Sequence, residues 1–507
     1  MSVLLLAMLA IPGGLATLLA FGRPRVSLAI GGLTAVLSVP MAASIDPRDA
    51  VALAGTVISG SDSLRTIALA WAAGIVLLGL ADALVGSGGA AIGPSLIGLG
   101  TGVPALAAAD AGLGFALLTA GGLAAALGPL AWPSGGPADP GRLGLRIMRP
   151  LAGAGLLALT AVAWGASPAG PLSALDPLGA VDPAFEVSIG LGLLAVVAAV
   201  AIRLGAIPAH AWAARFAESV PAGAIPATLG WGAAGFALVA FGWLDLTIAP
   251  VAPGLATERG LIAVVAAASV LLGGLAAVLH DDLEHVLGYS IVQDAGVALL
   301  AFTVITPGAG EAGRDWLIGM VAVKSGLAAW VLVTRSTFGV RRLSELGGWA
   351  RSSPTLGIAY GLVLFGAVGV PGMATFTARG VLTELALPAP FDLLVLLAAF
   401  APIVYLGRIL VIGLDRMSPA ARAAEPSRPR LRAFRPAGWT GGSIAGVIRG
   451  VPGALRENRF LLAAGCALAL AVIGLAMAAG GIGAPGSDQP IAAGAAGRPL
   501  APLLARV

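Results

Sequence analysis

Apolar runs long enough to cross a lipid bilayer recur along almost the whole of this 507-residue chain. A membrane-spanning helix needs about 20 mostly apolar residues, because each residue adds about 1.5 Å and the hydrocarbon core is about 30 Å thick. Only 11% of the residues are charged, whereas a soluble domain has about 25%. The sequence therefore predicts an all-α polytopic membrane protein and excludes a soluble enzyme with one membrane anchor.

Windows of about 20 apolar residues predict about fourteen transmembrane helices. The first seven windows are 2–21, 26–44, 66–86, 88–108, 111–131, 149–167 and 186–207. The other seven are 222–243, 260–279, 286–306, 315–334, 354–375, 391–414 and 459–481. The first window lacks a basic leader and a clear cleavage site, so we interpret it as a retained span and not as a signal peptide.

The arginines between the windows indicate the orientation of the chain. They gather after the first window, before the sixth, between the eleventh and twelfth, and in the Pro/Arg-rich segment 416–458. An even number of spans separates each of these loops from the next, so all of them can lie on one side of the membrane. The positive-inside rule makes that side cytoplasmic and places both termini outside the cytoplasm. Because topology accounts for the basic residues, a nucleic-acid partner is not expected.

The counts of metal-ligating residues exclude several kinds of redox site. Cys466 is the only cysteine, so the chain has no internal disulfide and no cysteine-ligated iron–sulfur cluster. The three histidines make paired haem ligands inside the membrane improbable. We expect no cofactor on this chain and no metal site.

Two predicted spans contain a proline beside glycine. They carry the sequences Gly205-Ala-Ile-Pro208 and Gly369-Val-Pro371-Gly372. Paired interruptions of this kind in the two halves of a transporter indicate an inverted repeat whose broken helices line an ion path. The alternative is that proline and glycine are simply frequent in membrane helices.

Charged residues inside these windows are the candidates for function, because each costs at least about 2.5–3.5 kcal/mol in hydrocarbon. Lys324 is the only lysine and lies in the middle of its window; an ammonium can lose its proton when desolvated, whereas a guanidinium does not. We interpret Lys324 as part of a proton relay, with a structural ion pair to an intramembrane carboxylate as the alternative. Arg203 and Arg379 are further candidates for the proton path, and the alternative is that each anchors its helix at the membrane interface. Asp82 is a candidate carboxylate that could equally pair locally, and His210 follows the first break and could equally be a loop histidine.

Two further patterns are weaker. The run His280-Asp-Asp-Leu-Glu-His285 contains residue types that bind divalent cations, but it joins two spans directly, and we interpret it as a solvated connector. The segment 308–313 fits a GxGxxG dinucleotide motif only by chance, because no strand precedes it.

Several of these segments, taken together and in order, resemble the antiporter-like membrane subunits of respiratory complex I (NADH-quinone oxidoreductase) and of Mrp-type cation/proton antiporters. They are Arg203 to Pro221 with its Pro208, His210 and Trp212, then Asp282 to Gly296, then Leu346 to Pro354, and finally Gly369 to Arg379. The resemblance covers roughly residues 66–415. It implies about fourteen spans, with two inverted five-helix repeats, broken helices and a hydrated polar axis.

The resemblance also implies a division of the chain. Residues 1–65 would form N-terminal transmembrane helices, 66–243 the first antiporter-like repeat, and 260–415 the second. Residues 416–458 would form a polar cytoplasmic linker, and 459–507 an isolated last helix with a tail.

The sequence departs from the family at the residues that carry protons. By position, the early glutamate of the family falls near Ile92, where no carboxylate stands. Arg203 and Arg379 replace titratable residues, Trp231–Ala233 occupies the place of a basic residue in the following span, and Glu284 replaces a lysine of the connector. Lys324 retains the central lysine.

The resemblance implies a proton-translocating, antiporter-like subunit of a complex I-type assembly in a bacterial inner membrane. Its partners would be other membrane subunits, which carry the redox cofactors, together with the lipid bilayer and protons or Na⁺. A divergent structural subunit without transport, or an Mrp-type antiporter subunit, is the alternative. The sequence leaves the assembly, the electron donor and any contact with quinone open.

Overall fold

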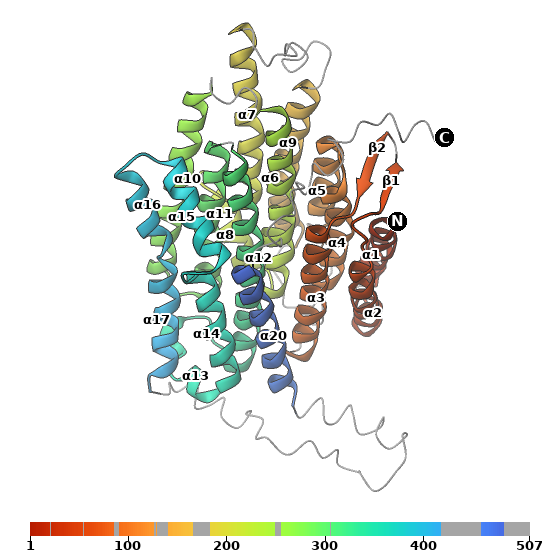
Figure 1. Ribbon diagram of the computed structural model, residues 1–507. Coiled ribbons are helices and arrows are strands. Elements are labelled where there is room, and N and C mark those ends of the chain that lie inside the picture. Colours follow the sequence, from red (N-terminus) through yellow and green to blue (C-terminus); the bar gives the residue numbers. More distant parts are fainter. Residues whose placement is uncertain are drawn as a thin grey trace.

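The structure is a computed structural model that describes residues 1–20, 22–53, 55–85, 91–125, 128, 140–165, 183–248, 255–304, 306–416 and 458–480. Helices dominate these residues (Figure 1). In the N-terminal half they are α1 (Ser2–Leu19), α2 (Pro24–Ala43), α3 (Asp62–Val85), α4 (Ile92–Ala107), α5 (Ala111–Ala125), α6 (Pro140–Gly165), α7 (Pro183–Leu204), α8 (His210–Ser219), the short turn η3 (Ala222–Ala224), the π-helix η4 (Pro226–Trp231) and α9 (Gly232–Thr247).

The C-terminal half continues in the same manner. Its helices are α10 (Ala256–Leu279), α11 (Leu283–Val304), α12 (Pro307–Phe338), the short turn η6 (Leu343–Glu345), α13 (Trp349–Ser352), α14 (Pro354–Val368), α15 (Ala374–Ala386), α16 (Phe391–Ala399), α17 (Pro402–Leu414) and α20 (Arg459–Gly480). The predicted linker 416–458 lies almost wholly outside the described residues, as does the tail after Gly480.

The prediction of an all-α polytopic membrane protein is confirmed. Within the described residues, 11 helical segments are long and apolar enough to cross a bilayer, and three shorter apolar helices, α4, α5 and α14, accompany them. Together they account for every predicted window. The count of fourteen spans stays a prediction, because the three shorter helices fall below the length that spans a bilayer unaided.

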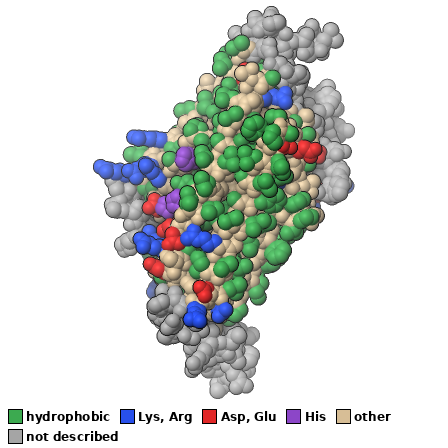
Figure 2. Space-filling view, turned by 90° about the vertical axis from the view of Figure 1, so that its left-hand side faces the viewer, with side chains coloured by type: hydrophobic (Ala, Val, Ile, Leu, Met, Phe, Trp, Pro, Cys, Tyr) green, Lys and Arg blue, Asp and Glu red, His purple; other side chains and the backbone are tan. Residues whose placement is uncertain are grey.

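The surface agrees with a lipid environment. Figure 2 shows one face of the molecule on which hydrophobic side chains cover most of the area, while charged and histidine side chains gather along its left edge and lower end. Exposed leucines and valines of α10, α16 and α17, among them Leu272, Leu397 and Val411, have no protein neighbour to cover them. Apolar side chains that point outward in this number require a hydrocarbon solvent.

A β-hairpin between α2 and α3 was not predicted. Strands β1 (Ala50–Leu53) and β2 (Thr56–Ser59) pair antiparallel, and Gly55 supplies the positive φ of 81° that the turn requires. The amino group of Met1 bonds Asp49 Oδ2 at 2.7 Å beside the first strand. The hairpin lies at the upper end of the bundle and α13 at the lower end (Figure 1).

Helices α11 and α12 form the centre of the bundle and are almost wholly buried. Although α20 is isolated in sequence, it packs along α12 and also contacts α14 and α3. The last helix is therefore part of the core around α12 and not a separate anchor.

Both predicted helix breaks are present. Helix α7 ends at Leu204 and α8 begins at His210, while α14 ends at Val368 and α15 begins at Ala374. Each break opens on a glycine with positive φ, 72° at Gly205 and 63° at Gly369, a conformation that costs other residues free energy. Non-helical backbone at this depth is tolerated because it is enclosed by protein.

The closest backbone approach in the second half joins α10 to α11. A Cβ added at Gly273 would lie 2.6 Å from the backbone N of Gln293, and one added at Gly296 would lie 2.6 Å from the backbone N of Val270. Small residues at these positions allow the two helices to pack backbone to backbone.

We predict that Gly273→Ala destabilises the protein by about 1–3 kcal/mol, because its methyl group forces α10 away from α11. Gly260→Ala, on the same helix but with open space around its Cβ position, should leave the thermal unfolding midpoint in detergent unchanged. Equal midpoints for the two variants would contradict the close packing described here.

Candidate functional site: a buried charge cluster and a lone arginine

The three basic residues singled out in the sequence all point into the protein. Arg203 is 1% exposed, Lys324 4% and Arg379 0%. Anchoring at the membrane interface, the alternative for the two arginines, requires a side chain that reaches water. The structure therefore contradicts that alternative.

Lys324 pairs with Asp294, a carboxylate that the sequence analysis had not selected. The Nζ atom of Lys324 on α12 lies 2.9 Å from Oδ2 of Asp294 on α11, and both side chains are buried. Trp316, two turns before Lys324, donates its Nε1–H to the backbone oxygen of Asp294 at 2.9 Å. This contact holds α11 and α12 in register around the ion pair.

Arg379 completes the cluster from the second break. Its Nη1 donates to the carbonyl oxygen of Val368 at 2.7 Å and its Nη2 to that of Ala367 at 3.2 Å. These carbonyls end α14, where the helix dipole is negative, so the cation is favoured there. The guanidinium also lies over the rings of Phe400, at 4.4 Å, and Trp316, at 5.0 Å.

Asp294 also acts electrostatically on Arg379. The charge cluster, defined as Asp294, Lys324 and Arg379, thus has two cations for one carboxylate. Arg379 is held by carbonyls and aromatic rings, whereas Lys324 forms an ion pair with Asp294. Of these cations, the lysine is the one that can release its proton.

Arg203 lies apart from the charge cluster, beside the first break. Its Nη2 is 3.4 Å from the carbonyl oxygen of Leu118 on α5 and 3.3 Å from that of Gly232 at the start of α9, and its guanidinium lies 5.4 Å from the ring centre of Phe236. The π-helix η4 connects this region to α12, because Gly230 packs against Val321.

The other two predicted residues lie elsewhere in the fold. Asp82 is buried near the end of α3, but the carboxylate that pairs with Lys324 is Asp294. His210 begins α8 directly after the first break and is half-buried. Neither residue belongs to the charge cluster.

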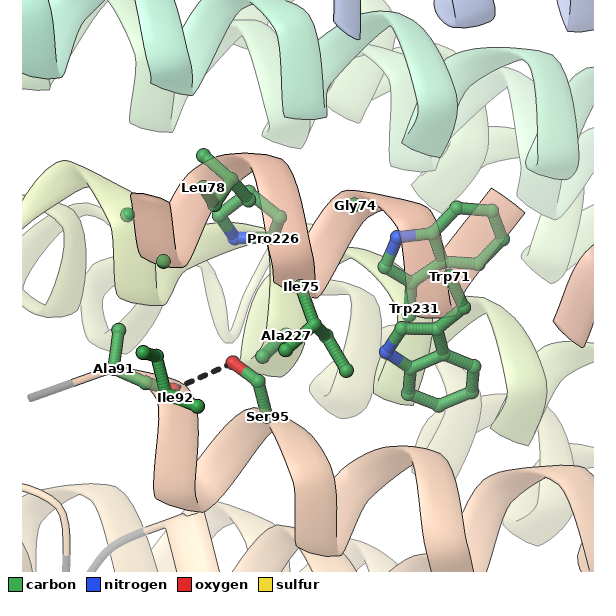
Figure 3. A pocket seen from close by; sticks show the side chains of 12 residues that line it. Trp71, Gly74, Ile75, Leu78, Ala91, Ile92, Ser95, Pro226, Ala227 and Trp231 are labelled. Atoms are coloured by element: carbon green, nitrogen blue, oxygen red, sulfur yellow. Dashed lines mark hydrogen bonds between the residues drawn. The ribbon is translucent and has the colours of Figure 1, made fainter. Parts of the chain in front are cut away.

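An apolar pocket occupies the place where the family resemblance implied proton-carrying groups. It lies between α3, α4 and η4, and both Ile92 and Trp231 line it. Figure 3 shows Trp231 beside Trp71, with the ring centres 5.6 Å apart and the rings stacked. The hydroxyl of Ser95 bonds the carbonyl oxygen of Ala91 within its own helix (Figure 3). Two of the departures seen in sequence, those at Ile92 and Trp231, thus meet in one apolar site.

Two more ion pairs along α12 were missed in the sequence. Arg314 bonds Asp245 of α9 at 2.5 Å near the start of α12, and Arg335 bonds Glu284 of α11 near its end. Lys324 lies between them, about 15 Å from each along the helix axis. Since Glu284 and Asp294 are both on α11, two of the three pairs join the same two helices. Asp245 and Glu284 lie just outside the predicted windows 222–243 and 286–306, so neither was counted as an intramembrane charge.

The connector that begins at His280 is a structured joint, and the prediction of a solvated loop was incomplete. Asp281 bonds Arg408 of α17 at 2.8 Å, and Asp282 pairs with Arg342 in a β-bridge. Burial raises the pKa of Asp282, but hydrogen bonds with Glu284 and His285 outweigh it and lower that pKa below its ordinary value. Among the described residues, no cluster of histidine, cysteine and acidic side chains could hold a metal ion.

These features together define a class of protein. A bundle of apolar helices with two breaks, each beside a buried arginine, encloses an ion pair midway along α12, which is the arrangement found in membrane ion-translocating proteins. A family model described as "NADH:quinone oxidoreductase/Mrp antiporter, TM" matches residues 180–403, and over this segment the chain is similar to that family.

The curated relatives are NADH-quinone oxidoreductase subunits. The chain is 29% identical over 216 residues to NADH-quinone oxidoreductase subunit N of Nitrosomonas europaea, covering 42% of this chain and 44% of the relative. It is 32% identical over 242 residues to subunit N 1 of Streptomyces griseus, covering 46% and 48%. The chain thus spans about half the length of the curated relatives it matches.

Solved structures share the fold over a longer stretch. A chain of respiratory complex I from Thermus thermophilus superposes with a TM-score of 0.64 at 20% identity, covering 92% of this chain and 99% of that one. A chain of the Mrp complex from Dietzia gives 0.63 at 18% identity, covering 94% and 95%. These comparisons support the architecture that the sequence motifs had implied.

We predict that Arg335→Met destabilises the protein by about 1–3 kcal/mol, because it leaves the buried carboxylate of Glu284 without its partner. The double variant Glu284→Gln/Arg335→Met should recover part of the loss, since the uncompensated charge is then gone. Arg341→Met, at an exposed arginine just after the end of α12, serves as the control. A double variant less stable than Arg335→Met would contradict this account of the pair.

Proposed function

We propose that this chain is an antiporter-like membrane subunit of a complex I-type assembly and that Lys324 carries protons within it. The observation that supports this is the buried ion pair of Lys324 with Asp294, next to the fixed charge of Arg379. A structural pair with this burial would be no more stable than apolar side chains of the same volume. A relay explains why a lysine stands there.

The proposed mechanism is electrostatic. When Lys324 is protonated, Asp294 is shared between Lys324 and Arg379, and the charge cluster carries one excess positive charge. When Lys324 releases its proton, Asp294 compensates Arg379 and the cluster becomes neutral. A charge change on a neighbouring subunit would shift this balance and thereby load or release the proton.

The neighbouring residues have supporting roles in this scheme. Arg379 is a fixed charge that caps α14, and Trp316 holds the backbone of Asp294. We do not assign Asp82 to the relay. Arg203 and His210 would set the charge and hydration of the first break.

A structural subunit without transport is the second candidate. It is favoured by the apolar pocket at Ile92 and Trp231, where the family resemblance implies proton-carrying groups. In that case the charge cluster would only fix α11, α12 and α15 relative to one another. An Mrp-type antiporter subunit has the same fold, and the choice between the two assemblies rests on the named relatives, which are NADH-quinone oxidoreductase subunits.

The assembly follows from the same reasoning. We propose that other membrane subunits surround the chain and that redox cofactors are on those partners. The two antiporter-like repeats, 66–243 and 260–415, would each contribute one break. Protons are the proposed ion, because a lysine binds and releases H⁺ but cannot coordinate Na⁺.

We predict that Lys324→Met abolishes proton translocation by vesicles that contain the assembled complex, and that Lys324→Arg abolishes it as well. The arginine keeps the charge and the pairing with Asp294 but does not release its proton. Translocation is measured with a pH-sensitive dye trapped in the vesicles. If the pair of Lys324 with Asp294 had only a structural role, the opposite result is expected: the complex with Lys324→Arg would translocate protons normally.

The orientation is part of the proposal: the arginine-rich loops lie in the cytoplasm and both termini outside it. We predict that a membrane-impermeant maleimide added to intact cells or spheroplasts labels Arg48→Cys, before the hairpin, and does not label Arg341→Cys. Both positions are exposed, and the native Cys466 is buried. Labelling of Arg341→Cys alone would reverse the orientation.

A further inference from the structure

Arg203 differs from the other buried cations in having no carboxylate near it. Lys324 pairs with Asp294, and Arg379 lies within the field of Asp294. No acidic residue among those described pairs with Arg203 or acts on its charge. The first half of the bundle therefore holds a positive charge that the described protein does not compensate.

The hydrogen bonds of Arg203 are also incomplete. Both of its contacts to carbonyl oxygens, at 3.4 and 3.3 Å, use the same nitrogen, Nη2, and both are long. Its Nε and Nη1 atoms are buried and have no partner among the described residues. A buried guanidinium with two unused donors is costly unless something binds them.

A small cavity adjoins this guanidinium. Its lining includes Arg203, Thr101, Gly121, Gly122, Thr228 and Gly232. Glycine at position 122 leaves room for the guanidinium, because a Cβ there would lie too close to Nη1 of Arg203. All the residues that line the cavity are uncharged apart from Arg203.

We propose that this cavity binds one small monovalent anion of the size and charge of chloride. The anion would accept hydrogen bonds from Nε and Nη1 and neutralise Arg203. A monovalent ion matches the single charge, whereas a dianion would only reverse the imbalance. Water could satisfy the two donors but would leave the charge. The proposal does not rest on the proposed function, because neutralising Arg203 requires no proton transport.

The first experiment measures binding of radiolabelled chloride to the full chain in lipid nanodiscs. The wild-type protein should bind one chloride per chain, and its thermal unfolding midpoint should be higher in chloride than in gluconate by about 2 °C or more, as for any ligand that binds only the folded state. Arg203→Gln should lose both effects.

A matched pair of variants at Gly122 tests the role of charge. Gly122→Asp supplies a carboxylate beside Arg203 and should remove chloride binding, because the charge is then neutralised within the chain. Gly122→Asn has the same size and no charge, so chloride should still bind, or bind with reduced affinity. The three atoms nearest to a Cβ at Gly122 all belong to the guanidinium of Arg203, so the same end of the same side chain must shift in both variants.

Three results would overturn the proposal. One is a wild-type protein with equal midpoints in chloride and gluconate and no bound label, which would mean that water alone fills the cavity. Another is chloride binding that persists in Arg203→Gln, which would place it elsewhere. The third is equal loss of binding in Gly122→Asp and Gly122→Asn, which would make the effect one of size and not of charge.

Discussion

The contact between the ammonium of Lys324 and the carboxylate of Asp294 is the interaction on which the arrangement of the central helices depends. Neither charge is tolerable alone in a hydrocarbon environment, so α11 and α12 must meet where these residues meet. The pair of Arg335 with Glu284 joins the same helices nearer one end, and the indole of Trp316 fixes the backbone at Asp294. The register of the two most buried helices is therefore set by polar contacts, while apolar packing fills the space around them.

The two halves of the bundle treat their buried arginines differently. In the second half, Arg379 closes the end of α14 and shares Asp294 with Lys324, so its charge is compensated from several directions. In the first half, Arg203 has only two long contacts to carbonyls, and stacked tryptophans fill the neighbouring pocket. The second half thus retains a titratable group, Lys324. In the first half, we propose that a bound anion balances the charge of Arg203. In the proposed function, proton movement is confined to the second half.

Much of the fold could be predicted from the sequence, because the bilayer imposes rules of length and polarity that apply to each segment separately. The apolar windows, the two glycine–proline breaks and the burial of Lys324 are local signals of this kind. The partner of Lys324 was not predictable, since choosing Asp294 over Asp82 requires knowing which helices are neighbours. The same limit explains why the ion pairs of Arg314 and Arg335 were missed. The hairpin at 50–59 was missed because a short strand pair carries little signal beside long apolar helices, and the packing of α20 depends on contacts far away in sequence.

Because Lys324 is the only lysine of the chain, its protonation can be observed without interference. The most direct measurement is the ¹⁵N spectrum of the chain labelled at the lysine side-chain nitrogen, reconstituted in bilayers with unlabelled partner subunits and recorded at rest and during turnover of the complex. The account predicts that an amine signal appears beside the ammonium signal during turnover, because Lys324 then releases and takes up its proton. A signal that is ammonium under both conditions would show that Lys324 holds its proton permanently and serves only to pair with Asp294.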